Sequence, residues 1–552
     1  MSILHKNLAT LSVRHAELSQ QLAQLLPSSR VRFSASRAGP LYAVIGDDRE
    51  TALHSRFDPR REASRLVAGS RSSGFCLVLG LGLGYHVREL LCQPQLQRAL
   101  IVEYDGALLR AILEQQDLSD VWQDSRVQLC VDQPPRAVAA AIAQHYVPVI
   151  HGNLSTLLLR GRFDCDRSLF SDAGTAASEA AEAAGADLSV QRVFGRQWMR
   201  NIISNSVACP VQTGLPRCRS AIVSAAGPSL DNKIDAIARR NADQLLIATD
   251  TSLPRLLGAG IRPDLVLAID CQLASYLHVL ATGKQQLTLV ADAGVHPALR
   301  RRFSAVHLIG GGHPLLAYLR AGGVPITWLD TSDGSVTHAA VRLAVQLGAE
   351  QVEVYGADFC YPRATAYARG SYIHSHVIGR AGRTMPYASG LYRFVLERPE
   401  LELDQIDGRW AYITKVMRHY RHRFANLQPE LGARIVRTIG EPPIDSGSAQ
   451  CGVQGHRYTE HGANATLNAV SDAAAGNARS VLGSYRQALA QIPTAHDPLW
   501  SYFDRITAAE RQLWQTLFPL AAFYSAQSRP AGTAALLEHT REGALRLLKR
   551  LI

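Results

Sequence analysis

The chain has 552 residues, of which 47% are hydrophobic and 19% charged, a composition typical of a soluble globular protein. This length is too great for one hydrophobic core and predicts about three or four domains. The net charge of +11 comes mainly from scattered arginines. Because no dense Lys/Arg segment with interleaved aromatics is present, we do not expect a nucleic-acid partner.

The cysteines and the N-terminus bear on the compartment. None of the nine cysteines forms a C-x-x-C pair, which favours reduced core thiols over a zinc site. Residues 1–20 are polar and lack the apolar core of a signal peptide. No apolar run is long enough to cross a membrane. The sequence therefore predicts a cytoplasmic protein without a membrane partner.

The N-terminal region, 1–150, is predicted to hold a helix over 3–26, short strands between 31 and 45, and a Rossmann-like domain. A strand over 75–79 runs into a glycine-rich turn, and the strand over 99–102 ends in an acid. Glycines followed by such an acid are how Rossmann-like domains hold a nucleotide or nucleoside. The residues of this possible second nucleotide site are Gly80, Gly82, Gly84 and Glu103. The alternative is a Rossmann-like scaffold that binds nothing.

The remaining chain divides into three predicted parts: a helical linker over 151–216, a central α/β domain over 217–440 and a helical C-terminal domain over 441–552. In the linker, residues 172–186 are predicted to form a helix that Gly185 ends, and 196–205 another. The central domain alternates strands and helices, which predicts a mainly parallel sheet covered on both faces. Its expected strands are 221–224, 245–248, 265–269, 287–291, 305–309, 326–329 and 352–355. Residues 391–423 are expected to be helical.

The stretch Ser220–Asp231 is predicted to be a buried strand, a tight Gly-Pro-Ser turn and a helix. Gly227 permits a close approach of the backbone, Pro228 presets a turn dihedral, and the Ser229 hydroxyl can cap the helix. Such a turn points backbone N–H groups at one spot, which favours a phosphate. The alternative is an ordinary strand-to-helix loop.

Several predicted central strands end in an acid, and ligands of open parallel sheets bind beyond that edge. A binding cleft is therefore expected there, although a single such acid usually caps a helix. The acids are Asp250, Asp270, Asp292, Asp330 and Asp358. Thr331, Ser332 and Gly334 begin the helix predicted over 336–347 and offer a second place for phosphate or sugar hydroxyls.

The segment 354–376 carries most of the candidate chemistry. Tyr361, Tyr367 and Tyr372, together with Arg369, can hold a departing phosphate. A histidine, His374 or His376, can take a proton from an incoming hydroxyl. The two histidines can instead bind a metal or be structural, and these alternatives stay open.

These motifs together resemble the motility accessory factor (Maf) family of flagellin glycosyltransferases, with an MptE-like central domain. They are Ala225–Leu230, Ala248–Asp250, Ile261–Asp264 before Ala268–Asp270, Thr331–Ser335 and Gly356–Phe359. Gly80–Tyr85 followed by Val102–Glu103 is similar to that family's N-terminal domain. The resemblance implies transfer of a nonulosonic acid, of the pseudaminic or legionaminic type, to Ser or Thr hydroxyls of flagellin.

The central domain also resembles bacterial sialyltransferases that use CMP-sugars. This resemblance implies that Gly227, Pro228, Ser229, Asp250, Asp270, Thr331, Ser332, Gly334 and Asp358 contact the nucleotide. It further implies that Tyr367 steadies the leaving phosphate together with Tyr361, whose place Cys360 can alternatively take, and that His374 or His376 is the base. The resembling enzymes need no metal. Asp250 and Asp270 replace residues that are usually uncharged there, so a divalent metal remains possible.

Two other functions compete with glycosyl transfer. The Gly-Pro-Ser-Leu and Asp pattern is also similar to an archaeal pterin pyrophosphokinase, which implies ATP and magnesium. The second competing function is that of a non-catalytic assembly factor that binds flagellin, because the helices predicted at both ends of the chain suit protein binding.

Overall fold

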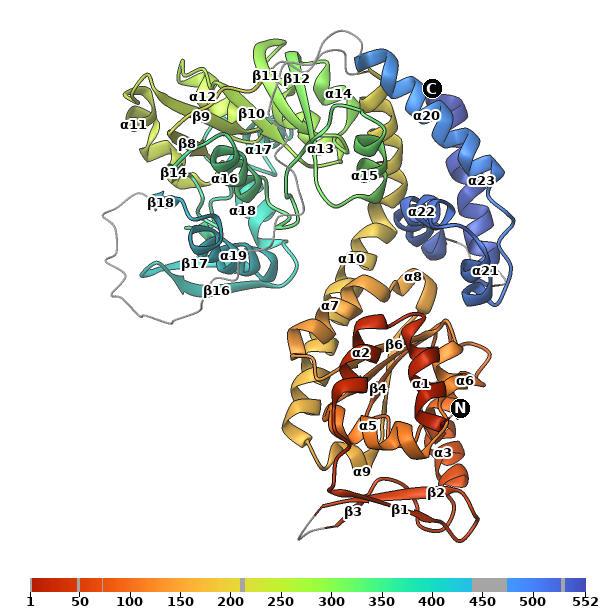
Figure 1. Ribbon diagram of the computed structural model, residues 1–552. Coiled ribbons are helices and arrows are strands. Elements are labelled where there is room, and N and C mark those ends of the chain that lie inside the picture. Colours follow the sequence, from red (N-terminus) through yellow and green to blue (C-terminus); the bar gives the residue numbers. More distant parts are fainter. Residues whose placement is uncertain (1, 47–49, 72, 209–213, 439–473, 528–531) are drawn as a thin grey trace. The chain divides into compact units, whose positions relative to one another are not determined.

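The computed structural model describes residues 2–46, 50–71, 73–208, 214–438, 474–527 and 532–552 (Figure 1). The chain forms two compact units. The first contains residues 1–195 and 491–544, and the second contains 196–490 and 545–552. Both have an α/β architecture built on a parallel sheet, which confirms the predicted fold class.

The first unit begins with two helices where the sequence predicted one over 3–26. They are α1 (Ile3–Ser12) and α2 (Ala16–Gln24). The Ser19 hydroxyl donates to the Leu8 carbonyl at 2.8 Å, which holds α2 against α1. The short strands predicted between 31 and 45 are β1 and β2, and they form an antiparallel sheet with β3, which was not predicted, in the order β1-β2-β3. Its strands are β1 (Val31–Ala35), β2 (Leu41–Ile45) and β3 (Thr51–Ala52).

The parallel sheet of the first unit has the order β6-β5-β4-β7, the arrangement that begins a Rossmann fold. Its strands are β4 (Phe75–Leu79), β5 (Arg98–Glu103), β6 (Val127–Val131) and β7 (Leu154–Leu158). The helices are α3 (Pro59–Ala68), α4 (Tyr85–Leu91), α5 (Gly106–Gln115), α6 (Ser119–Gln123), α7 (Pro135–His145), α8 (Pro148–His151) and α9 (Arg160–Phe163). Because β7 pairs with β4, this sheet extends beyond the predicted domain end at residue 150.

The predicted linker contains β7, α9 and the 42-residue helix α10 (Arg167–Ala208). Both helices expected in the linker are parts of α10. Gly185 was predicted to end the first of them and does not, because one glycine inside a helix costs only about 1 kcal/mol. Residues 209–213 of the linker lie outside the described residues.

The described C-terminal residues are mainly helical, as predicted. The helices are α20 (Ala474–Gln491), α21 (Leu499–Arg505), α22 (Ala508–Gln527) and α23 (Thr533–Leu551). They differ from the predicted separate domain, because residues 491–544 belong to the compact first unit. Within that unit the Trp500 N–H donates to Gln97 at 2.8 Å, and the Arg126 guanidinium lies 4.7 Å from the Trp500 ring centre. The part of the predicted domain over 441–473 lies outside the described residues.

The second unit contains an eight-stranded parallel sheet in the order β13-β12-β11-β10-β9-β8-β14-β18. Its strands are β8 (Ser220–Ser224), β9 (Gln244–Thr249), β10 (Leu265–Ala268), β11 (Gln285–Asp292), β12 (Phe303–Gly310), β13 (Thr327–Trp328), β14 (Gln351–Tyr355) and β18 (Arg434–Thr438). The seven predicted strands are confirmed. The sequence reasoning missed the edge strand β18.

Helices cover both faces of this sheet. On one face α16 packs across the central strands with α19, and Val223, Ile247 and Val354 point into the shared core. On the other face α11 and α12 pack against Ile222 and Leu246. The alternation of side chains between the two faces follows from the period of two in a strand. The helical elements are η1 (Pro228–Asn232), α11 (Ile234–Ala238), α12 (Leu253–Gly258), α13 (Leu273–Leu280), α14 (Pro297–Arg300), α15 (Pro314–Ala321), α16 (Val336–Gln346), α17 (Tyr372–Ile378), α18 (Tyr387–Leu396) and α19 (Lys415–Leu431).

The helical prediction for 391–423 is wrong in its middle. Between α18 and α19 the chain forms the antiparallel hairpin of β16 (Leu401–Ile406) and β17 (Arg409–Thr414), which β15 (Tyr361–Pro362) joins. Asp407 and Gly408 both have positive φ, 51° and 74°. An Asp-Gly pair in this conformation makes the two-residue turn that suits a hairpin.

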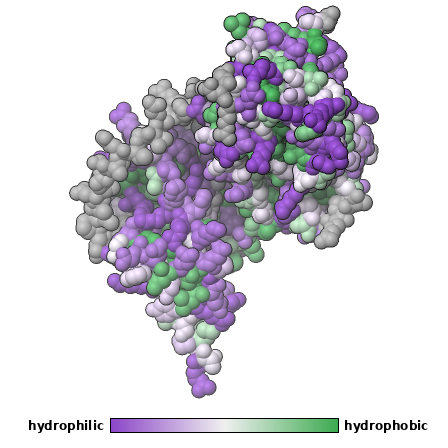
Figure 2. All heavy atoms as spheres, turned by 90° about the horizontal axis from the view of Figure 1, so that it is seen from below, coloured by the Kyte–Doolittle hydropathy of each residue, from purple (hydrophilic) through white to green (hydrophobic). Residues whose placement is uncertain are grey.

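The surface drawn in Figure 2 is largely hydrophilic, with hydrophobic side chains in small groups. Within the described ranges, every helix is too short or too polar to reach across a bilayer.

Candidate functional site

The Gly-Pro-Ser turn leaves β8 as predicted, but its polar groups bind the protein itself. The Ser229 N–H and hydroxyl both donate to Asp358 Oδ2, at 3.1 and 3.0 Å, and the Gly227 N–H donates to the Gly356 carbonyl at 2.7 Å. Pro228 begins the short 3-10 helix η1, which the Ser229 side chain does not cap. The Asp358 carboxylate therefore occupies N–H and O–H donors that the sequence assigned to a phosphate.

Only glycine fits at position 227, because Asp358 and the Gly356 backbone lie too close to leave room for a Cβ atom. A Cβ atom there would lie 2.0 Å from Asp358 Oδ2 and 2.5 Å from the Gly356 carbonyl oxygen. We expect Gly227→Ala to lower the free energy of unfolding by about 1–3 kcal/mol, because the backbone of Gly356 has to move. Chemical denaturation measures this loss. Gly258→Ala in α12 is the matched control, since no atom lies within 4 Å of its added methyl group. Equal stabilities of the two variants would contradict the prediction.

Asp250 follows β9 and forms a buried hydrogen-bonded pair with His278 of α13. Asp250 is 3% exposed, and its Oδ2 lies 3.1 Å from His278 Nδ1. Its Oδ1 accepts the Thr251 N–H at 2.8 Å. Sequence reasoning singled out Asp250 but missed His278. No motif marks this histidine, which stands at an ordinary position of the helix 28 residues further on.

Three tyrosines lie beside the Asp250–His278 pair. The Tyr372 ring centre lies 4.4 Å from that of His278 and 5.9 Å from that of Tyr367. Tyr361 contributes to raising the pKa of Tyr367. Burial raises the pKa of all three hydroxyls, so they stay protonated and can donate hydrogen bonds. Ala368, the residue after Tyr367, donates its N–H to the Ala226 carbonyl at 2.9 Å, which holds this loop against the Gly-Pro-Ser turn.

Arg398, just after α18, lies near the same tyrosines. Its positive charge opposes the rise in the pKa of Tyr361, Tyr367 and Tyr372. Its Nε is buried and has no hydrogen-bond partner among the described residues, and its guanidinium carbon lies 3.9 Å from the Phe394 ring centre. A guanidinium without a carboxylate partner, beside hydroxyl donors, is suited to an anionic ligand. Sequence reasoning missed this arginine because it stands in a segment without a motif.

The two predicted histidines lie differently. His374 is 9% exposed, and its Nδ1 pairs with the Tyr387 hydroxyl between α17 and α18. His376 is exposed, one helical turn after Tyr372 on the same side of α17. Neither has a hydrogen-bonded carboxylate among the described residues.

Asp270 and the loop over 331–334 join the site. The negative charge of Asp270, at the end of β10, contributes to raising the pKa of His278, Tyr372 and Tyr420. The Tyr420 hydroxyl donates to the Gly334 carbonyl at 2.9 Å, and the Gly334 N–H donates to the Thr331 carbonyl at 3.2 Å. The structure thus brings the predicted Asp250, Asp270, Gly334 and Tyr367 to one edge of the sheet.

The other strand-end acids make local contacts. Asp330 accepts the Ser332 N–H at 2.9 Å, and Asp292 accepts the Gly294 N–H at 2.7 Å. Desolvation raises the pKa of Asp292 to about 6. Among the residues that the structure describes, no three His, Cys, Asp or Glu side chains converge in a way that could hold a metal ion.

Asp333, within the loop over 331–334, binds side chains of the two helices α16 and α19. Its carboxylate is 2% exposed and accepts hydrogen bonds from Arg342 Nε at 2.7 Å and Arg423 Nη2 at 2.6 Å. Burial alone would raise the pKa of Asp333, but these hydrogen bonds hold it below its usual value. The stabilisation is therefore present above about pH 4, the unfolded value, and is lost as the pH falls toward the folded value.

We expect Asp333→Asn to reduce the free energy of unfolding at pH 7 by about 1–3 kcal/mol, because Arg342 and Arg423 lose a buried charged partner. The difference from the unmodified protein should shrink below about pH 4. Urea unfolding over a pH series measures it. Asp404→Asn, which removes an exposed partner of Arg418, should have little effect. A difference for Asp333→Asn that stays constant at acid pH would contradict this linkage.

The second nucleotide site predicted in the first unit is filled by the protein. Glu103 is 2% exposed, accepts the Leu81 N–H at 2.7 Å and pairs with Arg162 Nε at 2.7 Å. A Cβ atom on Gly80 would meet Arg162, one on Gly82 would meet His54, and one on Gly84 would meet Leu118. The Glu103 carboxylate is therefore already paired within the protein at this turn.

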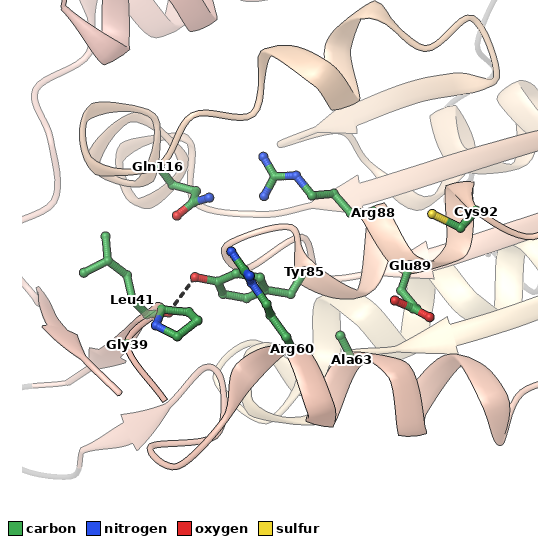
Figure 3. A pocket seen from close by; sticks show the side chains of 10 residues that line it. Gly39, Leu41, Arg60, Ala63, Tyr85, Arg88, Glu89, Cys92 and Gln116 are labelled. Carbon is green, nitrogen blue, oxygen red and sulfur yellow. Dashed lines mark hydrogen bonds between the residues drawn. The ribbon is translucent and has the colours of Figure 1, made fainter. Parts of the chain in front are cut away.

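A cavity of about 600 Å³ lies elsewhere in the first unit, between α3, α4 and the loop before β2 (Figure 3). Arg60, Arg88, Glu89 and Tyr85 line it. The Tyr85 hydroxyl donates to the Leu41 carbonyl at 2.9 Å, and Arg88 pairs with Asp120 at 2.7 Å. Two of its polar side chains are thus already bound within the protein.

Comparison with known proteins agrees with this architecture. A family model described as 6-hydroxymethylpterin diphosphokinase MptE-like matches residues 196–364. An uncharacterized protein of Treponema pallidum (strain Nichols) is 31% identical over 169 residues, which are 29% of this chain and 79% of that protein. A second one from the same organism is 28% identical over 162 residues, or 28% of this chain and 56% of that protein.

The whole fold also has a counterpart among solved structures. A Maf glycosyltransferase from Magnetospirillum magneticum AMB-1 aligns with a TM-score of 0.58 at 15% identity, over 100% of this chain and 95% of that chain. The chain therefore belongs to the MptE-like family and has the fold of a Maf glycosyltransferase.

Proposed function

We propose that the protein is a glycosyltransferase that moves a nonulosonic acid from a CMP-sugar to Ser or Thr hydroxyls of flagellin. The observation that carries this proposal is the cluster of Tyr361, Tyr367, Tyr372 and Arg398 beside the Gly-Pro-Ser turn. Protonated hydroxyls and an unpaired guanidinium are what a departing phosphate needs. The Maf glycosyltransferase fold supports the reaction class, and the motif resemblance supports the donor and the acceptor.

The donor would lie across the carboxyl edge of the second unit's sheet, where ligands of open parallel sheets bind. The loop over 331–334 and Asp270 would face its nucleotide or sugar. The turn itself would contribute through its shape, since Asp358 occupies the Ser229 donors. Inverting transfer at this edge requires phosphate stabilisation on one side of the anomeric carbon and a base on the other.

The direct test is a transfer assay with CMP-activated nonulosonic acids and purified flagellin, read by mass spectrometry of the intact acceptor. Calorimetric titration with CMP, ATP and GTP, with and without magnesium, accompanies it. CMP binding together with a mass gain of one sugar on flagellin supports the proposal. A preference for ATP with magnesium and diphosphorylation of a hydroxymethylpterin would favour the pterin kinase. Flagellin binding with neither nucleotide binding nor transfer would favour an assembly factor.

A further inference from the structure

We propose that His278, held by Asp250, is the base that removes the proton from the acceptor hydroxyl. This inference rests on the proposed glycosyl transfer and assigns its base to a pair that includes neither His374 nor His376.

The geometry is that of an oriented imidazole. Asp250 lies at the carboxyl end of β9, where its Oδ1 accepts the Thr251 N–H and its Oδ2 faces His278 Nδ1 at 3.1 Å. An ionised carboxylate only accepts hydrogen bonds, so the His278 proton belongs on Nδ1. Nε2 then carries a lone pair, and it has no hydrogen-bond partner among the described residues. This is the arrangement in which a carboxylate orients a histidine base and stabilises the imidazolium that forms.

The position of the ring supports the assignment. The His278 ring lies against Tyr372, and Tyr372 lies against Tyr367, so the imidazole adjoins the groups proposed to hold the leaving phosphate. The His278 side chain is 12% exposed, which leaves it accessible to a substrate and shields it from bulk water. His374 instead pairs with a phenol, and exposed His376 has no partner carboxylate among the described residues.

The electrostatics favour a base that works near neutral pH. Burial alone would lower the pKa of His278, but the charge and hydrogen bond of Asp250 and the charge of Asp270 raise it above its usual value. The groups that face the ring are Asp250, Asp270, the Tyr372 phenol and the Thr251 hydroxyl, whose Oγ1 lies 3.1 Å from Nδ1. Removing the Asp250 charge must therefore lower this pKa.

The acceptor oxygen forms a bond to the anomeric carbon while the bond from that carbon to the phosphate oxygen breaks. The electron pair of the broken bond stays on the phosphate oxygen, and CMP leaves. The hydroxyl proton passes to His278 Nε2 and from there to water.

The test compares His278→Gln with the matched control His422→Gln, an exposed histidine on α19. His278→Gln should lower the transfer rate by about 10²–10⁴-fold, whereas CMP affinity stays within about twofold, because the base does not hold the nucleotide. His422→Gln should transfer at the unmodified rate. Full transfer by His278→Gln, or loss only in His374→Gln or His376→Gln, would overturn the assignment.

Asp250→Asn tests the positioning role through the pH profile. The acid limb of the transfer rate should move to lower pH, because the imidazole loses the charge that raises its pKa. An acid limb at the same pH would exclude Asp250 from this role. Should His278→Gln fold poorly, histidine NMR of the unmodified protein and of Asp250→Asn tests the pairing on which the assignment depends. One histidine of the unmodified protein should have a pKa above about 6.5, and this pKa should be lower in Asp250→Asn. If no histidine pKa falls in the variant, the Asp250–His278 pairing is wrong.

The outcomes separate the two proposals. If the unmodified enzyme transfers sugar and His278→Gln transfers equally well, the glycosyltransferase stands and the base is another group. If the unmodified enzyme transfers no sugar at any pH, the proposed function fails, and the assignment of the base fails with it.

Discussion

Arg162→Met is expected to destabilise the first unit by about 3–5 kcal/mol. Arg162 is 1% exposed, and its guanidinium pairs with Glu103 at 2.7 Å, donates to the Tyr104 carbonyl at 2.6 Å and stacks over Phe170. Without it the donors left to the Glu103 carboxylate among the described residues are the N–H groups of Leu81 and Tyr104. A buried charge without a counterion is among the costliest changes that a core can undergo.

Hydrogen exchange of the peptides covering β4 and β5, together with urea unfolding, measures this loss. The control is Arg160→Met, two residues earlier on α9, whose side chain is 90% exposed and lies 3.7 Å from Asp164. It should change stability by less than about 1 kcal/mol. Adding Glu103→Gln to Arg162→Met should recover part of the loss by removing the unpaired charge. An equal effect of Arg160→Met and Arg162→Met would show that the ion pair is not what stabilises this unit.

The same pair shows why the sequence could not decide about ligand binding in the first unit. A glycine-rich turn marks a place where a Cβ atom does not fit, and a ligand and a protein side chain give the same signal. Here the atoms that approach Gly80 and Gly82 belong to Arg162 and His54. The strands themselves were predictable, because apolar runs such as 75–79 are buried on both faces.

In the second unit the sequence predicted that the candidate residues lie at the carboxyl edge of the sheet, but it did not predict which of them pair with one another. Strand ends are readable from apolar runs, so Asp250 and Asp270 were found. The partner of Asp250 depends on how α13 rotates against the sheet, which no local pattern near His278 encodes. Asp358 was assigned to the nucleotide, yet it closes the Gly-Pro-Ser turn, because that contact joins residues 129 positions apart. The hairpin over 401–414 was missed although Asp407-Gly408 is a strong local turn signal.

Arg398→Met is expected to lower the glycosyl transfer rate by about 10²–10³-fold, the usual effect of removing one group that stabilises developing charge. The guanidinium carbon lies 3.9 Å from the Phe394 ring centre, which lies 6.3 Å from that of Tyr367, and among the described residues its charge is not paired with a carboxylate. In the proposed reaction negative charge accumulates on the leaving phosphate, so the loss should fall mainly on kcat. Arg398→Lys should recover only part of the rate, because an ammonium cannot form the bidentate contact of a guanidinium.

The control for Arg398 is Arg393→Met on α18, whose exposed side chain forms an ion pair with Glu397 four residues on. It removes the same charge five residues earlier in the chain and so tests whether any effect is a long-range effect of charge. Steady-state transfer kinetics and CMP titration are measured for each variant. Equal rate losses in both would mean that net charge, not a placed guanidinium, assists the reaction. A loss of CMP affinity without a change in kcat would place Arg398 on the bound nucleotide, because an interaction equally strong in the ground and transition states leaves kcat unaltered.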